Sequence, residues 1–287
     1  MALFSLSSLA ADIRTVEDEQ GTFSITTTPK RIVVLEYSFV DALAAVEISP
    51  VGIADDNNPE RIIPQVRKLI QPWTSVGTRS QPSLEVISEL KPDLIIADVQ
   101  RHSAIYDDLK TIAPTLILKS RGESYKENLI SSQKIGVVVN QDDKMQRRID
   151  QHNNTMMRYK KELESFSGTT VQFAVTTDKG MWLHSPVAYA GGVIDVLGLS
   201  SPMPNENKVA SVEITLEQLL KLNPDYLLEG RYTKTTVLDH WKKQPLYQLL
   251  KINNDKQLID VSAPLWSLSR GMLAAEGMAE NLTNIVK

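Results

Sequence analysis

The most informative absence in this chain of 287 residues is cysteine, of which there is none. Disulfides, thiolate metal sites and cysteine nucleophiles are therefore excluded. No run of 18 or more apolar residues occurs, so the sequence predicts no membrane-spanning helix. The net charge is −4, and a nucleic-acid partner, which normally requires a basic surface, is not expected.

Sequence motifs for catalysis and for metal binding are also missing. The four histidines show neither His-x-His nor His-Glu-x-x-His spacing, so we expect no metal ion held directly by the protein. There is no Gly-x-Ser-x-Gly elbow, no Walker A loop and no Gly-x-Gly-x-x-Gly turn. We therefore expect neither a cofactor nor enzymatic activity.

The N-terminal segment MALFSLSSLAA, residues 1–11, is a short apolar run that ends in small residues. A polar stretch follows from Asp12 to Gln20. This order is typical of the apolar core and cleavage region of a secretory signal, although no Lys or Arg precedes the run. We interpret residues 1–11 as a signal-peptide remnant, which predicts an exported protein.

A repeated segment indicates that the chain has two related halves. Residues 83–96 read SLEVISELKPDLII, and residues 215–228 read TLEQLLKLNPDYLL. Each begins with a residue suited to cap a helix and continues with apolar residues at helical spacing. Each then ends its helix before Pro-Asp and a short apolar strand. A chance recurrence of a common helix–strand pattern is the alternative, but the length of the match favours two related lobes.

Helical stretches alternate with short apolar strands in both halves, which is typical of parallel sheets with helices on their faces. The predicted fold class is α/β, with two Rossmann-like lobes, a central sheet in each, and a ligand cleft between them. The expected strands are 32–35, 51–54, 94–97, 115–118, 171–176, 226–229 and 257–261. The expected helices are 39–46, 84–90, 187–197, 216–222 and 272–286.

A stretch without glycine or proline, from about 142 to 166, joins the two halves. Its apolar residues recur at spacings of three, four or seven, which predicts one amphipathic helix roughly 35 Å long. We therefore expect an N-terminal α/β lobe over 20–140, a rigid connecting helix over 141–167 and a C-terminal α/β lobe over 168–287. A rigid connection predicts a modest closure of the lobes on a ligand, and we expect a monomer.

Five of the 12 arginines follow predicted strands, at the edge where open α/β sheets bind ligands. A guanidinium group matches a carboxylate or phosphate with two parallel hydrogen bonds. The cluster therefore predicts a local positive pocket for a small polyanion. For any single arginine the alternative is exposure to solvent or pairing with a nearby acid. The five candidates are Arg79, Arg101, Arg121, Arg231 and Arg270.

Aromatic residues make up only 6% of the chain, and several are expected at the same edge. Tyr37 follows the first strand, and Trp182 and His184 are expected in the loop before the helix at 187–197. Trp266 precedes Arg270. We predict that these side chains line the ligand site, and packing in the core is the alternative for the two tryptophans.

Long segments of the chain resemble one known family. PKRIVVLEYSFVDALAAVEISPVGIADD, VGTRSQPSLEVISELKPDLIIAD and LKSRGESYKENL are very similar to segments of the periplasmic ferric dicitrate-binding proteins of Gram-negative iron importers. The similarity continues through WKKQPLYQLL and SRGMLAAE and covers nearly the whole chain after the leader. TTDKGMWLHSPVAYAGG matches this family loosely, and SPMPNENKVASVE is particular to this chain.

The resemblance implies a class III, siderophore-type substrate-binding protein in the periplasm. Such a protein captures ferric citrate, whose chelator supplies the iron ligands, and delivers it to the permease subunits of an ABC transporter in the inner membrane. The resemblance also implies that Glu85 and Glu217, at matching positions of the repeat, dock with arginines of the permease. Helix electrostatics near each N-terminus is the alternative for both glutamates.

Three other ligands and one other class of protein remain as alternatives. Within the same fold, the ligand could be another ferric siderophore such as a catecholate. Cobalamin is disfavoured because a nearly neutral ligand does not need several arginines, and haem because no axial His or Tyr is singled out. The alternative from a different class is a metal-dependent enzyme on a related two-lobed scaffold.

Overall fold

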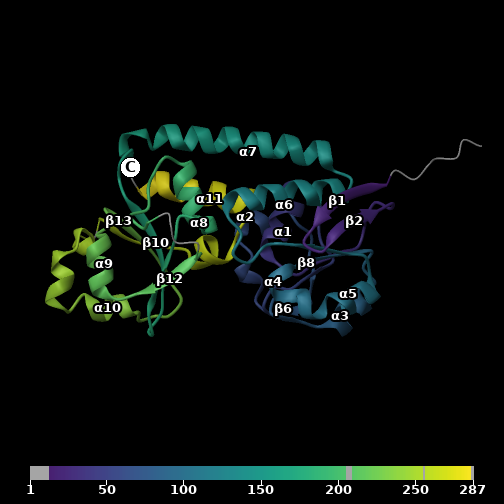
Figure 1. Ribbon diagram of the computed structural model, residues 1–287, viewed down its shortest axis with the longest axis horizontal. Helices are drawn as coiled ribbons and strands as arrows, with labels where there is room; N and C mark the ends of the chain where they lie inside the picture. The colour runs from purple at the N-terminus through teal and green to yellow at the C-terminus, as the bar shows by residue number, and fades with distance from the viewer. Residues whose placement is uncertain (1–12, 205–208, 255, 286–287) are drawn as a thin grey trace, which may run out of the picture.

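Short buried runs of Val, Ile and Leu form the centres of two separate sheets, one in each half of the chain. The computed structural model describes residues 13–204, 209–254 and 256–285, so the proposed signal segment 1–11 lies outside the described residues. Figure 1 shows two α/β lobes side by side, with one long helix running along the top of both. The predicted α/β class with two lobes is confirmed.

The N-terminal lobe is built on a parallel sheet with the strand order β5-β4-β3-β8-β9. Its inner strands are buried on both faces, which explains their continuous apolar sequences. The strands are β3 (Ile32–Val34), β4 (Gly52–Ile53), β5 (Thr74–Ser75), β8 (Leu94–Asp98) and β9 (Thr115–Leu118). The helices are α1 (Tyr37–Ala45), α2 (Pro64–Arg67), α3 (Leu84–Glu89), α4 (Val99–His102), α5 (Tyr106–Ile112) and α6 (Tyr125–Val138).

Two antiparallel hairpins accompany this sheet, and neither was expected from the sequence. They pair β1 (Arg14–Asp18) with β2 (Gly21–Ile25), and β6 (Gly77–Thr78) with β7 (Gln81–Pro82). Short 3₁₀ segments cover Pro59–Arg61 and Ser103–Ile105.

The C-terminal lobe has a mixed sheet with the strand order β12-β11-β10-β13-β14. Its strands are β10 (Val171–Thr176), β11 (Met181–His184), β12 (Ser211–Ile214), β13 (Tyr226–Arg231) and β14 (Leu258–Val261). Its helices are α8 (Tyr189–Val196), α9 (Leu216–Leu222), α10 (Val237–Trp241) and α11 (Met272–Ile285). Single 3₁₀ or π turns cover Glu164–Phe166, Pro245–Leu249, Lys251–Asn253 and Pro264–Leu268. β11 and β12 pair antiparallel, so this sheet differs from the fully parallel one that the sequence predicted.

The repeated segment folds in the same way in both lobes. It forms α3 and β8 in the first lobe and α9 and β13 in the second, and each strand is the fourth of its five-stranded sheet. The side chains of Ser83 and Thr215 cap the helices, because each accepts a hydrogen bond from the backbone N–H three residues later. The residue before each proline, Lys91 or Asn223, has a positive φ of 45° or 43°, which ends the helix.

The aspartates of the two Pro-Asp pairs have equivalent structural roles. Asp93 accepts the backbone N–H of Arg31 at 2.8 Å, directly before β3. Asp225 accepts the backbone N–H of Thr170 at 2.8 Å, directly before β10. Each aspartate thus ties its own strand to the start of the neighbouring strand, which gives the repeat a structural reason.

The long helix α7 (Asp142–Glu162) connects the lobes, as Figure 1 shows. Its 21 residues span about 32 Å at 1.5 Å per residue. Met145, His152 and Met156 are its buried residues, and they lie on one face. The helix predicted over 142–166 is therefore present, with its last residues in the 3₁₀ turn Glu164–Phe166.

The C-terminal helix α11 returns to the first lobe, although it follows the last strand of the second. It packs against α7 and α1. Asp41 of α1 accepts the backbone N–H groups of Leu273 and Ala274 at 3.1 and 3.0 Å, so it caps α11. Arg148 of α7 makes a two-pronged ion pair with Glu276 at 2.9 and 2.8 Å. The lobes are therefore connected twice, once by α7 and once by α11.

Candidate functional site

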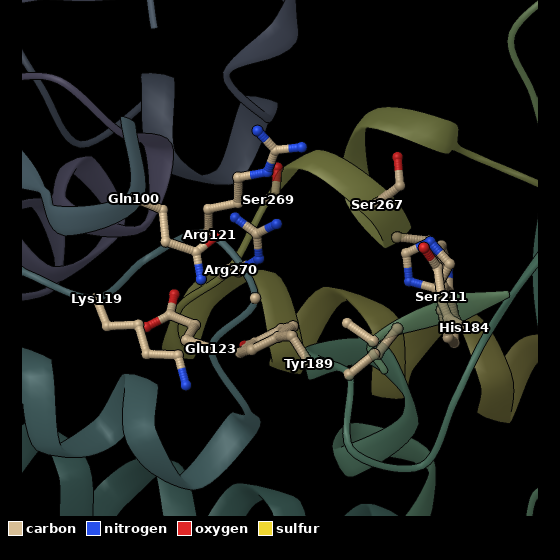
Figure 2. A pocket seen from close by; sticks show the side chains of 15 residues that line it. Gln100, Lys119, Arg121, Glu123, His184, Tyr189, Ser211, Ser267, Ser269 and Arg270 are labelled. Carbon is tan, nitrogen blue, oxygen red and sulfur yellow. The ribbon is translucent and has the colours of Figure 1, made fainter. Parts of the chain in front are cut away.

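A cavity of about 460 Å³ lies between the lobes, where loops from both meet. This volume is within the usual range for a small-molecule site. Figure 2 shows Gln100, Lys119, Arg121 and Glu123 on one side and His184 and Ser211 on the opposite side. The cavity is lined by Gln100, Lys119, Arg121, Gly122, Glu123, His184, Ala188, Tyr189, Ala190, Ala210, Ser211, Trp266, Ser267, Ser269 and Arg270.

Arg121 and Arg270 bring positive charge to the cavity from two loops that are far apart in the sequence. Arg121 follows β9, and Arg270 directly precedes the glycine at the start of α11. No carboxylate of the described residues lies within 4 Å of either guanidinium group, whereas Lys119 pairs with Glu127 at 2.7 Å. Both arginines are therefore free to bind an anion with two parallel hydrogen bonds.

The loop that carries Arg121 is held by one buried carboxylate. Asp98, at the end of β8, accepts the backbone N–H groups of Ser120 and Arg121 at 2.7 and 2.9 Å. The Arg121 side chain itself is exposed. The carboxyl ends of β8 and β9 thus present an exposed cation on a hydrogen-bonded backbone, as expected at this edge of a parallel sheet.

Arg270 is positioned by its neighbour Gly271. The hydroxyl of Tyr189 donates to the Gly271 carbonyl at 2.6 Å and accepts its N–H at 3.0 Å. Gly271 has a φ of 133°, and a Cβ added there would lie 2.2 Å from the Asp41 carboxyl carbon. Only glycine fits this position, so the turn that aims Arg270 is closely determined by Asp41 and Tyr189.

Glu123 is the acidic side chain of the cavity, and it is only 1% exposed. Its Oε1 accepts a hydrogen bond from Asn128 at 3.0 Å, and its Oε2 has no partner among the described residues. Burial raises the pKa of Glu123 to about 8; Arg270 opposes this shift, and Glu36 adds to it.

His184 and Trp266 form the more apolar wall. Burial and the charge of Arg270 lower the pKa of His184 to about 4, so the imidazole is neutral at pH 7. Its ring packs edge-on against Phe173 with centroids 4.7 Å apart. Trp266 is 1% exposed and its Nε1 donates to Asn281 at 3.1 Å, so it is a packing residue that also lines the cavity.

Trp182 and His184 lie on strand β11, not in a loop as the sequence suggested. The apolar alternation Met181, Leu183 is the signal that was missed, because both these side chains face the core. Trp182 is half-buried and pairs across the strands with Val175, and it is not among the residues that line the cavity.

Arg79, Arg101 and Tyr37 gather in a different place, around the buried Glu36 and the partly buried Asp56. Arg79 Nη2 lies 2.8 Å from Asp56, and Arg101 Nε lies 2.5 Å from Glu36. The Arg79 guanidinium also lies over the Tyr37 ring, 4.1 Å from its centroid. Burial alone would raise the pKa of Asp56, but the hydrogen bonds from Arg79 outweigh it and hold the pKa well below its usual range.

Arg231 is also paired with acids and does not line the cavity. Its Nη2 lies 2.6 Å from Asp239, and its Nη1 lies 3.2 Å from Glu229. Of the nine predicted ligand residues, four line the cavity together: Arg121, His184, Trp266 and Arg270.

Several cavity residues were missed by the sequence reasoning. Glu123 lies two residues after Arg121 in the same loop, so the rule that selected the arginine also applies to it. Tyr189 begins α8, a helix that was expected but gave no reason to place this side chain in the cavity. Ser211 lies on β12, an antiparallel strand that the sequence did not predict.

Glu85 and Glu217 lie away from the cavity, on α3 and α9. Both side chains are exposed, each in the first turn of its helix. Figure 1 shows α3 and α9 in different lobes, toward opposite ends of the molecule. Hydrogen bonding to the Thr215 side chain lowers the pKa of Glu217, so this carboxylate is charged at neutral pH.

Two absences among the described residues concern membrane-spanning helices and metal sites. None of their helices is both long and apolar enough to cross a membrane. Within the same residues, no group of three or more His, Asp or Glu side chains is arranged to hold a metal ion.

Comparison with known proteins places the chain in a family. Residues 32–264 match the periplasmic binding protein family. The chain is 45% identical over 271 residues to the Fe(3+) dicitrate-binding periplasmic protein FecB of Escherichia coli (strain K12), covering 94% of this chain and 89% of that protein. It is 40% identical over 271 residues to the Fe(3+)-citrate-binding protein YfmC of Bacillus subtilis (strain 168), covering 94% of this chain and 85% of that protein.

Solved structures share the fold at lower sequence identity. Staphylococcus aureus SirA in complex with staphyloferrin B matches with a TM-score of 0.81 at 19% identity, covering 95% of this chain and 98% of that one. The petrobactin-binding protein YclQ of Bacillus subtilis matches with a TM-score of 0.80 at 21% identity, covering 96% and 99%. The predicted family and the prediction of a binding protein are confirmed: the chain belongs to the periplasmic binding protein family.

Proposed function

We propose that this protein captures ferric citrate and delivers it to an ABC importer. The relatives at 45% and 40% identity are a ferric dicitrate-binding and a ferric citrate-binding protein, which supports this choice over a catecholate. Because relatives of this chain include periplasmic proteins and lipoproteins, we further propose that the protein is exported and works in the periplasm as a monomer.

The observation that carries the proposal is the pair of unpaired arginines, Arg121 and Arg270, in a cavity between the lobes. A citrate chelate presents several carboxylates, and each guanidinium can bind one of them with two parallel hydrogen bonds. Gln100, Ser211 and Ser269 also line the cavity, and their side chains are further hydrogen-bond donors.

Iron in this proposal is cargo held by its chelator. The His184 imidazole is neutral at pH 7, but no second imidazole lines the cavity among the described residues. The one carboxyl there, on Glu123, is buried and its pKa is raised. Such a site recognises the outer oxygen atoms of a complete chelate and does not need to coordinate the metal.

Delivery would use Glu85 and Glu217, which the two lobes expose at matching positions of the repeat. A permease with one arginine site per half could then contact both lobes at once. This part of the proposal concerns the outer surface, so it separates delivery from capture.

A fluorescence titration tests the proposed ligand. Trp266 lines the cavity, so a ferric chelate bound there should quench its emission. We expect saturable quenching by ferric citrate, weaker binding of iron-free citrate, and no saturable response to a ferric catecholate or to cobalamin. Tight binding of the catecholate, with no response to ferric citrate, would overturn the proposal.

A further inference from the structure

Glu123 is an acidic side chain in a cavity whose other features suit an anion. It lies in the loop between β9 and α6 and lines the cavity together with Arg121 and Arg270. An ionised carboxylate at this place would repel an anionic ligand, and the repulsion is strong where water is excluded. The proposed function alone does not explain why an acidic side chain lines a cavity that binds an anion.

The hydrogen bonds around Glu123 suit a neutral carboxyl group. Asn128 Nδ2 donates to Oε1 at 3.0 Å, whereas Oε2 is buried without a donor among the described residues. The Oδ1 atom of Asn128 is likewise buried and has no donor. A buried carboxylate needs several donors, but a neutral carboxyl group brings its own O–H and can donate it.

The charges that face Glu123 come from every element around it. Arg270 precedes α11 and favours the ionised form, while Glu36, after β3, and Asp98, at the end of β8, oppose it. Lys119 in the same loop is paired with Glu127, and the phenol of Tyr189 on α8 is held by Gly271. Burial is the largest effect, and it raises the pKa to about 8. An anionic ligand adds one more negative charge and raises the pKa further.

We propose that Glu123 takes part in binding as a neutral carboxylic acid, whose Oε2–H donates a hydrogen bond to a carboxylate oxygen of the bound chelate. This inference rests on the proposed function, because it assumes a carboxylate-rich ligand in the cavity. Charge-assisted O–H···O hydrogen bonds are short and strong. The arginines attract any anion, whereas the Glu123 donor selects for an acceptor oxygen at one position.

The proposal predicts proton uptake on binding. At pH 9 most free protein would carry an ionised Glu123, and the complex would need to gain a proton. The affinity of wild type for ferric citrate should therefore fall about tenfold between pH 7 and pH 9. Glu123→Gln keeps an N–H donor but cannot titrate, so its affinity should change much less over this range.

Calorimetry in buffers of different ionisation enthalpy measures the number of protons taken up. Ferric citrate, prepared with excess citrate, would be titrated into wild type, Glu123→Gln and the control Glu280→Gln, which alters an exposed acid on α11. Proton changes of the ligand are common to all three proteins, so only the difference between them matters. We expect wild type and Glu280→Gln to take up more protons than Glu123→Gln, with the difference growing above pH 7.

Equal proton uptake by wild type and Glu123→Gln at every pH would overturn the proposal while leaving ferric citrate binding intact. Absence of binding by wild type would instead overturn the proposed function. If Glu123→Gln does not fold, wild type labelled with ¹³C at glutamate carboxyl groups can be titrated with and without gallium citrate, a diamagnetic analogue. A carboxyl resonance whose titration moves to higher pH with the ligand supports the proposal, and its absence contradicts it.

Discussion

At the scale of single residues, the carboxylates near each arginine decide whether it forms an ion pair or is available to bind a ligand in the cavity. Arg79 forms ion pairs with Glu36 and Asp56, and Arg101 forms one with Glu36. Arg231 forms an ion pair with Asp239. Arg121 and Arg270 lack such partners among the described residues and line the cavity. Glu36 is separated from Arg79 by 43 positions, so the sequence could show that arginines follow strands but not which acid each one meets.

Removal of either cavity arginine should weaken binding of ferric citrate. We expect Arg121→Ala and Arg270→Ala each to cost about 1.5–3 kcal/mol, the range for hydrogen bonds to charged groups. Lysine should recover only part of this, because it lacks the planar fork. Arg231→Ala is the matched control, since this arginine pairs with Asp239 outside the cavity. Equal losses in all three alanine variants, measured by titration, would contradict the assignment.

Arg79 should matter for folding. Its side chain is 8% exposed and its partner Asp56 is 10% exposed, so Arg79→Ala leaves a largely buried carboxylate with only the more exposed Arg61 as its cation. The variant loses hydrogen bonds to a charged group, so we expect it to lose about 1.5–3 kcal/mol of unfolding free energy. Arg67→Ala, which breaks an ion pair with the exposed Glu60, should cost less than about 1 kcal/mol. Urea unfolding of both variants checks this prediction, and an unchanged midpoint for Arg79→Ala would refute it.

At the scale of elements, the sequence predicted those helices and strands whose start and end signals lie close together in the chain. The repeat gave α3–β8 and α9–β13 because caps, helical periodicity and Pro-Asp endings all lie within 14 residues. The hairpin β1–β2 and the strand β12 were missed because their half-exposed sequences show only weak apolar alternation, and β11 was missed because its alternation spans only four residues. The capping of α11 by Asp41 joins positions more than 230 residues apart, so no local pattern could show it.

Because Asp41 caps α11, its titration should make the stability of the folded protein depend on pH. Burial raises the pKa of Asp41 to about 7, although the N–H groups of Leu273 and Ala274 oppose the shift. The folded protein therefore binds more protons than the unfolded chain between pH 4 and 7, and this contribution to stability falls as pH rises through that window. Asp41→Asn cannot titrate, so the stability difference between wild type and this variant should shrink or reverse from pH 4 to 7.

Thermal unfolding of both proteins at several pH values measures that difference. Asp41→Asn also replaces one acceptor oxygen at the cap, so a lower melting temperature is expected at pH 4. A difference that stays constant from pH 4 to 7 would show that Asp41 does not titrate in this range.

At the scale of the whole molecule, α7 and α11 hold the two lobes around the cavity. Arg148 and His152 of α7 both contact Glu276 of α11, at 2.8 Å in each case. Because two helices connect the lobes, and not one, we expect the lobes to close only slightly on the ligand. The partner that receives the ligand would then recognise the two lobes at a nearly fixed spacing.

The proposed docking glutamates give a test at this scale. Glu85→Ala combined with Glu217→Ala should leave ferric citrate affinity near wild type but sharply reduce ligand uptake or transporter-stimulated ATP hydrolysis. Arginine at both positions should do more damage, because repulsion is added to lost attraction. Glu89→Ala with Glu280→Ala, two other exposed acids, is the control pair. Normal transport with a slightly lower melting temperature would assign Glu85 and Glu217 to helix stabilisation alone.

The return of α11 to the first lobe also determines the order in which the chain can fold. Asp41 finds its partner Ala274 only 233 positions later, so α1 keeps an unfilled surface until the last 14-residue helix has been made. Contacts of such long sequence separation slow folding, because the intervening chain must first be closed into a loop. The first lobe therefore cannot reach its final form early in synthesis. The surface of α1 that packs against α11 stays uncovered until α11 has been synthesised.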